Sequence, residues 1–187
     1  MNEKELRNMM YTAQLDSTNL PIVIRYPRGE GVMPDLQKDT MAKKYPFEEI
    51  QIGKGRKLKD GEGIAILSFG PHGNFAASAI RDVKAEGINP AHYDMRFVKP
   101  IDEYILHEVF GKFKKIITIE DGTVVGGFGS AVLEFMNEHK ADVKIMGIPD
   151  RLVEHGSPKE LYHEIGLDAE AIAVVLREMA EVKVLIK

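Results

Sequence analysis

Apolar residues recur along most of the chain in two patterns that predict alternating strands and helices. Residues 64–69 (IAILSF) form a short, almost wholly apolar run, which is typical of a strand buried on both faces of a parallel sheet. Residues 73–86 carry apolar positions three and four apart, which predicts a helix with one buried face. The same alternation predicts further strands at 92–97, 115–120 and 143–148 and further helices at 103–111, 127–138, 158–164 and 169–181. Over residues 55–187 this alternation predicts an α/β fold with a doubly wound, mostly parallel sheet flanked by helices.

Polar residues at helix starts support two of these boundaries. Ser157 with Glu160 forms a capping box that has Pro158 at the first helical position, and Asp168 is placed to cap the last helix. A short β ribbon is expected just before the sheet, with strands near 49–52 and 55–58.

The first thirty residues predict one helix, at 3–15, and one strand, at 22–25. A single helix and strand cannot bury their apolar faces alone, so residues 1–30 are interpreted as the C-terminal remnant of an upstream domain. Residues 31–54, rich in glycine, proline and mixed charge, are interpreted as an interdomain linker. The α/β domain then occupies residues 55–187.

Composition excludes several classes of protein. The net charge of -4 argues against a nucleic-acid or anionic-membrane partner. The absence of cysteine excludes disulfides, thiolate zinc sites and a cysteine nucleophile. There is no apolar run of roughly 20 residues and no signal-peptide core at the N-terminus, so we expect a soluble cytoplasmic protein.

The candidate chemistry begins with a basic turn, RYPRG at residues 25–29, directly after the predicted strand. Arg25 and Arg28 place two guanidinium groups on a backbone shaped by proline and glycine, which suits capture of a phosphate or carboxylate. A strand followed by a basic turn is also common on ordinary surfaces, so the turn alone does not define a site.

A glycine-rich turn, GGFGS at residues 126–130, lies between a strand and a helix, where an anion could bind. It lacks the spacing of a dinucleotide fingerprint, so close packing of helix and strand, or of subunits, is the better interpretation. Glu120 and Asp121 end the preceding strand. Glu120 is expected to cap backbone N–H groups of this turn rather than to act in catalysis.

Other polar residues are interpreted structurally. Asp94, Arg96 and Lys99 alternate with apolar residues and predict an exposed, ion-paired strand face. Ser68 and Ser130 have no nucleophile-elbow context and no obvious histidine base, so hydrolase chemistry has no support.

The histidines show no metal-ligand spacing, so no histidine metal site is expected, and His155 is assigned a structural hydrogen bond. The six are His72, His92, His107, His139, His155 and His163.

Several motifs follow one another in a specific order: RYPRG (25–29), DMRFVKPID (94–102), IEDG (119–122), GGFGS (126–130), GIPD (147–150) and HGS (155–157). In this order the chain, from about residue 2 to about residue 176, resembles the C-terminal part of the 1-deoxy-D-xylulose-5-phosphate synthases. These enzymes are thiamine-diphosphate-dependent members of the transketolase family. Looser versions of the motifs occur in transketolases and in the β subunits of 2-oxo acid dehydrogenases.

The resemblance implies a transketolase-type C-terminal domain in a homodimeric, cytoplasmic transferase. The parent reaction would condense pyruvate with glyceraldehyde 3-phosphate, releasing CO2, to give 1-deoxy-D-xylulose 5-phosphate for isoprenoid, thiamine and pyridoxal biosynthesis. Thiamine diphosphate and Mg2+ would be bound by upstream domains, since Glu120-Asp121-Gly122 lacks the glycine and asparagine of the family's metal motif. The chain alone would then be inactive.

By position, the resemblance implies one substrate-binding residue: Arg28 matches the family's contact to the phosphate of glyceraldehyde 3-phosphate. Arg25 is expected to pair with a carboxylate or carbonyl, and Tyr26 to pack at the domain junction. No catalytic, cofactor-binding or metal-binding residue is expected in this chain.

Three alternatives stay open. The chain could be a stand-alone α/β interaction or dimerisation module that uses the sheet edge and residues 126–130. It could be an anion-binding regulatory domain built on Arg28 or the glycine turn. It could also be a β-subunit-type piece of a 2-oxo acid dehydrogenase, which the RYPRG and DMRFVKP motifs make the weaker choice.

Overall fold

The computed structural model describes residues 1–29, 31–32, 46–136 and 139–181. A five-stranded sheet has the order β1-β3-β2-β4-β5, with β1 antiparallel to β3 and every other neighbouring pair parallel. The strands are β1 (Arg56–Lys59), β2 (Ile64–Phe69), β3 (Ala91–Asp94), β4 (Lys115–Thr123) and β5 (Asp142–Ile148). This arrangement confirms the predicted doubly wound α/β fold.

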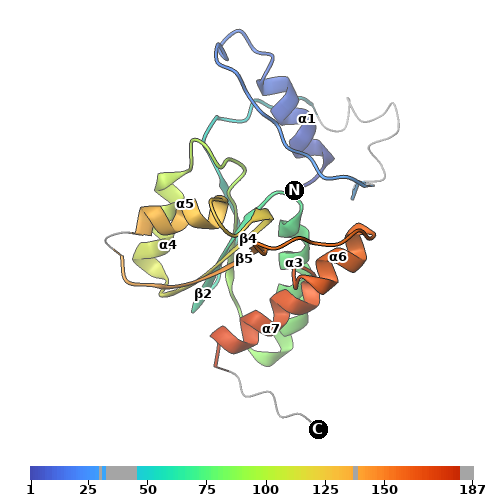
Figure 1. Ribbon diagram of the computed structural model, residues 1–187. Helices are drawn as coiled ribbons and strands as arrows, with labels where there is room; N and C mark the ends of the chain where they lie inside the picture. The colour runs from blue at the N-terminus through green and yellow to red at the C-terminus, as the bar shows by residue number, and fades with distance from the viewer. Residues whose placement is uncertain (30, 33–45, 137–138, 182–187) are drawn as a thin grey trace.

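Helices cover both faces of the sheet (Figure 1). One face carries α3 and α7 and the other carries α4 and α5, as the two buried clusters show. The helices of this part of the chain are α3 (His72–Val83), the 3-10 turn η2 (Lys84–Glu86), α4 (Glu103–Lys112), α5 (Phe128–Phe135), α6 (Pro158–Glu164) and α7 (Ala169–Met179). Because β2 and β4 lie side by side while the chain leaves β2 to the α3 face and β3 to the α4 face, the winding reverses between β2 and β4.

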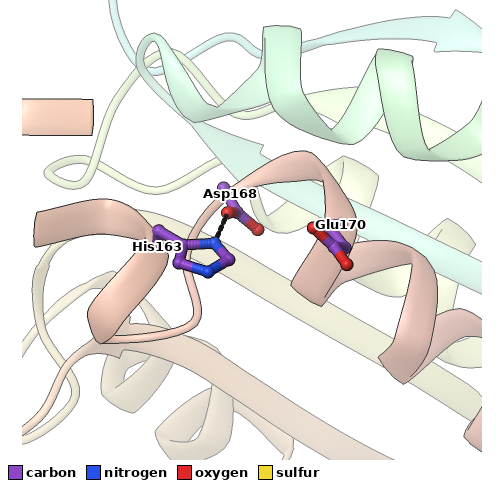
Figure 2. Close-up of side chains that lie close together, drawn as sticks. All are labelled: His163, Asp168 and Glu170. Carbon is purple, nitrogen blue, oxygen red and sulfur yellow. Dashed lines mark hydrogen bonds and ion pairs between the residues drawn. The ribbon is translucent and has the colours of Figure 1, made fainter. Parts of the chain in front are cut away.

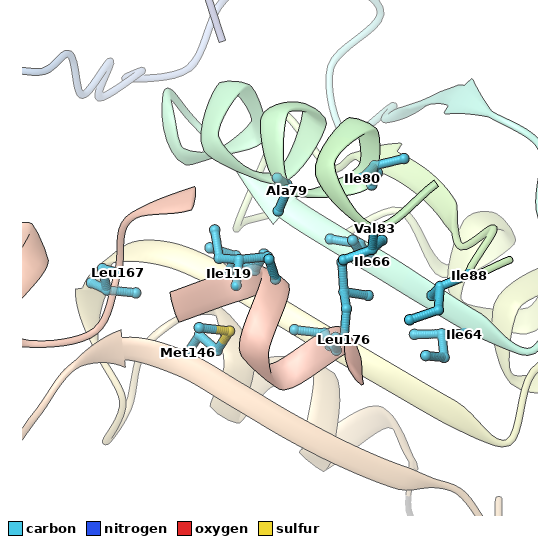
Figure 3. Packing of buried hydrophobic residues seen from close by; sticks show 14 residues of the cluster. Ile64, Ile66, Ala79, Ile80, Val83, Ile88, Ile119, Met146, Leu167 and Leu176 are labelled. Atoms are coloured by element: carbon cyan, nitrogen blue, oxygen red, sulfur yellow. The ribbon is translucent and has the colours of Figure 1, made fainter. Parts of the chain in front are cut away.

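Two apolar clusters fill the space between the sheet and its helices. Figure 3 shows the cluster under α3 and α7, in which Ile66, Ile119 and Leu176 meet. The opposite cluster centres on Leu67 and Phe110. Each fully buried side chain of this size contributes about 1.5–3 kcal/mol relative to exposure, so the two clusters supply the main stabilisation of the sheet.

Most predicted elements are confirmed, but the predicted strand at 49–52 is wrong. The expected ribbon does not form, because β1 pairs with β3 across the sheet. The backbone N–H of Ile50 instead donates to Thr12 Oγ1 at 2.8 Å, which ties this segment to the N-terminal helix. The predicted capping box at Ser157 and the Asp168 cap are both present.

The N-terminal part forms one helix, α1 (Glu3–Thr12), capped by the Asn2 side chain. Residues 22–25 were expected to form a strand but carry no strand assignment and are largely exposed. A strand needs hydrogen-bonded neighbours, and none of the described residues supplies a ladder here. Residue 30 of the predicted remnant and residues 33–45 of the predicted linker lie outside the described residues, so the division into domains at 30 and 54 stays a prediction.

Among the residues that the structure describes, none of the helices has both the length and the apolar character needed to cross a membrane.

Candidate functional site

A cavity of about 520 Å3 lies at the carboxyl ends of β2, β3 and β4. Phe69, Asp94 and Asp121 bring these three strand ends to its wall, and α1 together with residues 25–29 and 31–32 forms the opposite wall. Open α/β sheets bind ligands outside the carboxyl ends of their strands, at the point where the winding reverses. The cavity therefore occupies the place where this fold class offers a site.

Three arginines line the cavity, and they differ in what their guanidinium groups contact. Arg25 donates to the backbone oxygen of Asp121 at 2.9 Å, which confirms the expected carbonyl partner. Arg96 donates to Glu5 through two nitrogens, at 2.7 and 3.1 Å. The exposed guanidinium of Arg28 makes no hydrogen bond or ion pair with any residue that the structure describes, so it is available to a ligand.

A network of ion pairs around two buried carboxylates joins α1 to the sheet. The Glu5 side chain, 6% exposed, accepts from Arg96 and from Arg56, and Arg56 also pairs with Asp94. The expected exposed strand face is therefore wrong: β3 ends at Asp94, which is buried, and Arg96 lies beyond it with a φ of +55°. That left-handed backbone turns the Arg96 side chain toward α1, where the pairing with Glu5 offsets its strain.

Asp121 connects the basic turn to the sheet domain. Its side chain accepts a hydrogen bond from the Tyr162 hydroxyl at 2.9 Å, while its backbone oxygen accepts from Arg25. Burial, followed by the bond to Asp121, raises the pKa of Tyr162 to about 12, so this hydroxyl keeps its proton at neutral pH. Tyr26, expected to pack at a domain junction, is instead 74% exposed at the rim of the cavity, because none of the described residues covers it.

The glycine turn closes on Glu120 as expected. The buried carboxylate accepts from the backbone N–H groups of Phe128 at 2.9 Å and Gly129 at 2.8 Å, at the N-terminus of α5. A Cβ on Gly129 would lie 2.6 Å from Ile145, so the glycine is needed for close packing of α5 on the sheet. The Glu120 carboxylate is bound to the N-terminus of α5, and the Asp121 carboxylate accepts a hydrogen bond from Tyr162. Because both carboxylates are already engaged, the pair does not fit a role in holding Mg2+ for a thiamine cofactor.

Ser68 does have a histidine neighbour, contrary to the sequence prediction. Its hydroxyl lies 2.9 Å from His92 Nε2 and also donates to the backbone oxygen of Tyr93. The single hydroxyl proton is then directed at a carbonyl, and both side chains are buried between β2 and β3. Burial, with Lys59 nearby, lowers the pKa of His92 to about 4. The pair is a structural contact, and hydrolase chemistry remains without support.

Figure 2 shows His163, Asp168 and Glu170, the one group of described residues whose ligand atoms come within 4.8 Å of one another. Asp168 already accepts from the Ala171 N–H as the cap of α7 and from His163 Nδ1 at 2.7 Å. The bond to Asp168 raises the pKa of His163. Capping and ion pairing explain this group without a metal.

The remaining histidine expectation is not met. His155 is exposed, and no hydrogen bond joins its side chain to another described residue.

The strand order defines a doubly wound α/β domain with a cavity at the carboxyl ends of its strands, and similarity to known proteins shows its family. Residues 53–172 match the family model described as Transketolase, C-terminal domain, and the chain belongs to that family. It is 58% identical over 184 residues to the 1-deoxy-D-xylulose-5-phosphate synthase of Cytophaga hutchinsonii, covering 97% of this chain and 28% of that protein. The synthase of Bacteroides thetaiotaomicron is 53% identical, with 97% of this chain and 27% of that protein covered. The chain thus spans little more than a quarter of the length of these relatives.

Solved structures agree with the family. A split-gene transketolase, described as an inactive β4 tetramer, superposes with a TM-score of 0.67 at 30% identity, covering 74% of this chain and 46% of that one. A transketolase mutant of Pichia stipitis gives a TM-score of 0.52 at 19% identity over 71% of this chain and 19% of that one, which shows the shared fold alone.

Proposed function

We propose that this chain is the C-terminal part of a 1-deoxy-D-xylulose-5-phosphate synthase and supplies part of its acceptor site. The enzyme would condense pyruvate with glyceraldehyde 3-phosphate and release CO2. Thiamine diphosphate, which supplies the chemistry for decarboxylating pyruvate, would be held with Mg2+ by the upstream part of a cytoplasmic homodimer. Relatives at 58% and 53% identity that carry this name support the reaction.

The site proposal depends on the guanidinium group of Arg28, which is not bound by any described residue. Arg28 lines the cavity at the carboxyl edge of the sheet with its guanidinium uncommitted to any described residue, whereas Arg25 and Arg96 are both engaged. A guanidinium group binds a phosphate through two parallel hydrogen bonds, which fixes both the position and the orientation of the bound group. Arg28 would therefore hold the phosphate of glyceraldehyde 3-phosphate and orient its aldehyde for attack.

An Arg28→Ala substitution in the complete enzyme tests this assignment. Losing a bidentate charged contact of about 2–3 kcal/mol should raise the KM for glyceraldehyde 3-phosphate by about 30- to 160-fold. The KM for pyruvate, which has no phosphate, should stay within about twofold. Arg81→Ala is the matched control, since Arg81 is exposed on α3 and, among the described residues, its side chain bonds to Ser78 alone. Equal changes for both substrates, or none, would remove Arg28 from the phosphate site.

We further propose that the isolated 187 residues have no synthase activity, because the carboxylate pair at 120–121 is already engaged and the cofactor would be held upstream. Purified chain is incubated with pyruvate, glyceraldehyde 3-phosphate, thiamine diphosphate and Mg2+, and the sugar phosphate product is assayed. Turnover above the protein-free reaction would contradict this.

A further inference from the structure

Arg25 donates its hydrogen bond to the backbone carbonyl of Asp121, a residue that has no ladder partner in the sheet. Pairing of β2 with β4 ends at Glu120, and the register of β4 with β5 passes from Ile119 directly to Thr123. Asp121 therefore lies in an irregularity of β4, without a ladder partner on either side. Such bulges re-aim side chains next to functional sites and leave the bulged residue unpaired. Contacts of the Asp121 side chain can therefore fix its position.

Tyr162 supplies that contact. Its hydroxyl donates to Asp121 Oδ2 at 2.9 Å, and its ring is held edge-on against two rings of α3. The ring centroid lies 4.7 Å from that of His72, at 90°, and 5.9 Å from that of Phe75, at 67°. His72 is fully buried, and its ring nitrogens make no hydrogen bond with the described residues, so it serves here as a packing surface. The ring of Tyr162 is thus fixed by packing, with its hydroxyl directed at the bulge.

We propose that Tyr162 is a positioning residue for the acceptor site. Through Asp121 it fixes the carbonyl that holds Arg25, and Arg25 in turn holds the turn that presents Arg28 to the cavity. The inference rests on the proposed function for its effect on catalysis, but the contact between Tyr162 and the turn can be tested without any activity.

The chain contains a matched control for this test. Tyr93 also donates its hydroxyl to a carboxylate, Glu108, at 3.0 Å, and burial followed by this bond also raises its pKa to about 12. Its contact lies between β3 and α4, away from Arg25. Tyr162→Phe and Tyr93→Phe therefore remove the same kind of hydrogen bond, and only the first is linked to the basic turn.

The first measurement is the rate at which trypsin cleaves the Arg25–Tyr26 and Arg28–Gly29 bonds in the folded 187-residue chain, followed by mass spectrometry. Losing one hydrogen bond that restrains the turn should speed both cleavages about fivefold in Tyr162→Phe, while Tyr93→Phe cleaves as the parent does. Equal rates in the two variants would overturn the inference. Arg25→Gln, an exposed change that leaves the core intact, should speed cleavage at Arg28–Gly29 to the same extent, and no change there would also overturn it.

The second measurement is kinetic and uses the complete synthase. Tyr162→Phe should raise the KM for glyceraldehyde 3-phosphate about fivefold and leave the KM for pyruvate within about twofold. In an Arg25→Gln background the same change should add nothing, because the two residues act in series. If Arg28→Ala leaves both KM values unchanged, the phosphate role proposed for Arg28 fails. If Arg28→Ala behaves as expected and Tyr162→Phe matches Tyr93→Phe, only the positioning role fails.

Discussion

Two regions of this chain differ in how far their apolar side chains are exposed to solvent. The sheet domain (residues 56–136 and 139–181) buries whole strands, and Ile66, Leu67 and Leu106 have no exposed surface. The N-terminal region (residues 1–29 and 31–32) leaves Leu20 75% and Val23 89% exposed. The sheet domain has two apolar clusters of its own, whereas hydrogen bonds and ion pairs such as those of Glu5 and Arg25 join the N-terminal region to it. Folding and the proposed site thus depend on different kinds of interaction.

The largest expected effect comes from truncating the same residue type in the two regions. Leu106→Ala removes a fully buried side chain and should cost about 4 kcal/mol, from lost burial and from the cavity left behind. Leu20→Ala, in the N-terminal region, should change the free energy of unfolding by less than about 0.5 kcal/mol. Urea denaturation followed by circular dichroism measures both. A comparable loss in the two variants would show that the N-terminal region has a core that the exposed fractions do not reveal.

Low pH should destabilise the sheet domain in particular, because all the buried histidines lie in that domain. The unfolded chain protonates His92 near its ordinary pKa of 6.5, whereas burial keeps the folded pKa at about 4. The unfolded state therefore binds more protons between these values, so stability is present above pH 6.5 and is lost as the pH falls toward 4. The loss should approach roughly 3 kcal/mol at 1.36 kcal/mol per pKa unit. Burial also lowers the pKa of His72, which acts in the same direction.

His92→Gln provides the control for this pH dependence. The amide can still donate to Ser68, but it does not titrate, so the variant should lose much less stability between pH 6.5 and 4 than the parent. Denaturation at half-unit pH steps compares the slopes. If the parent and the variant lose the same stability between pH 6.5 and 4, protonation of His92 is not the cause of the loss.

The two regions also differ in how far the sequence predicts them. The bounds of β2 and α6 match the expected ranges residue for residue, because an apolar run defines one and a capping box with proline defines the other. These signals lie within the element itself. The strand expected at 22–25 depends on neighbours that a local pattern does not contain, and so it was wrong.

The candidate site was predicted only in its local parts. The Glu120 cap follows from its motif, since the carboxylate binds backbone N–H groups of the turn that comes directly after it. The phosphate role of Arg28, which the resemblance implies, stays a prediction. Glu5 and Tyr162 were missed because their partners are distant in sequence: Arg96 lies 91 residues from Glu5, and Asp121 lies 41 residues from Tyr162. The one usable signal was the position of Glu5 on the side of a short amphipathic helix. That position does not tell a buried, salt-bridged carboxylate from a solvated one.

Of these core and charge substitutions, Glu5→Gln is expected to lower the free energy of unfolding least. It tests most directly how the N-terminal region is attached to the sheet domain. This carboxylate is the charge that α1 inserts between Arg56 and Arg96, and neutralising it removes the carboxylate that pairs with Arg96 and leaves Arg56 paired with Asp94. Breaking a buried pair costs about 3–5 kcal/mol, and we expect about 2 kcal/mol here because both arginines are partly open to water. Glu178→Gln, at an exposed position on α7, is the matched control.

Hydrogen exchange shows where that free energy acts. If α1 is a separate unit anchored by Glu5, amide protection in α1 should fall by about 30-fold in Glu5→Gln while the amides of β2 keep theirs. The turn carrying Arg28 lines the same cavity wall as α1, so its amides should exchange faster too. A uniform loss of protection that includes β2 would mean that both regions unfold as one cooperative unit. The buried charges would then stabilise the sheet domain as a whole rather than the attachment of the N-terminal region to it.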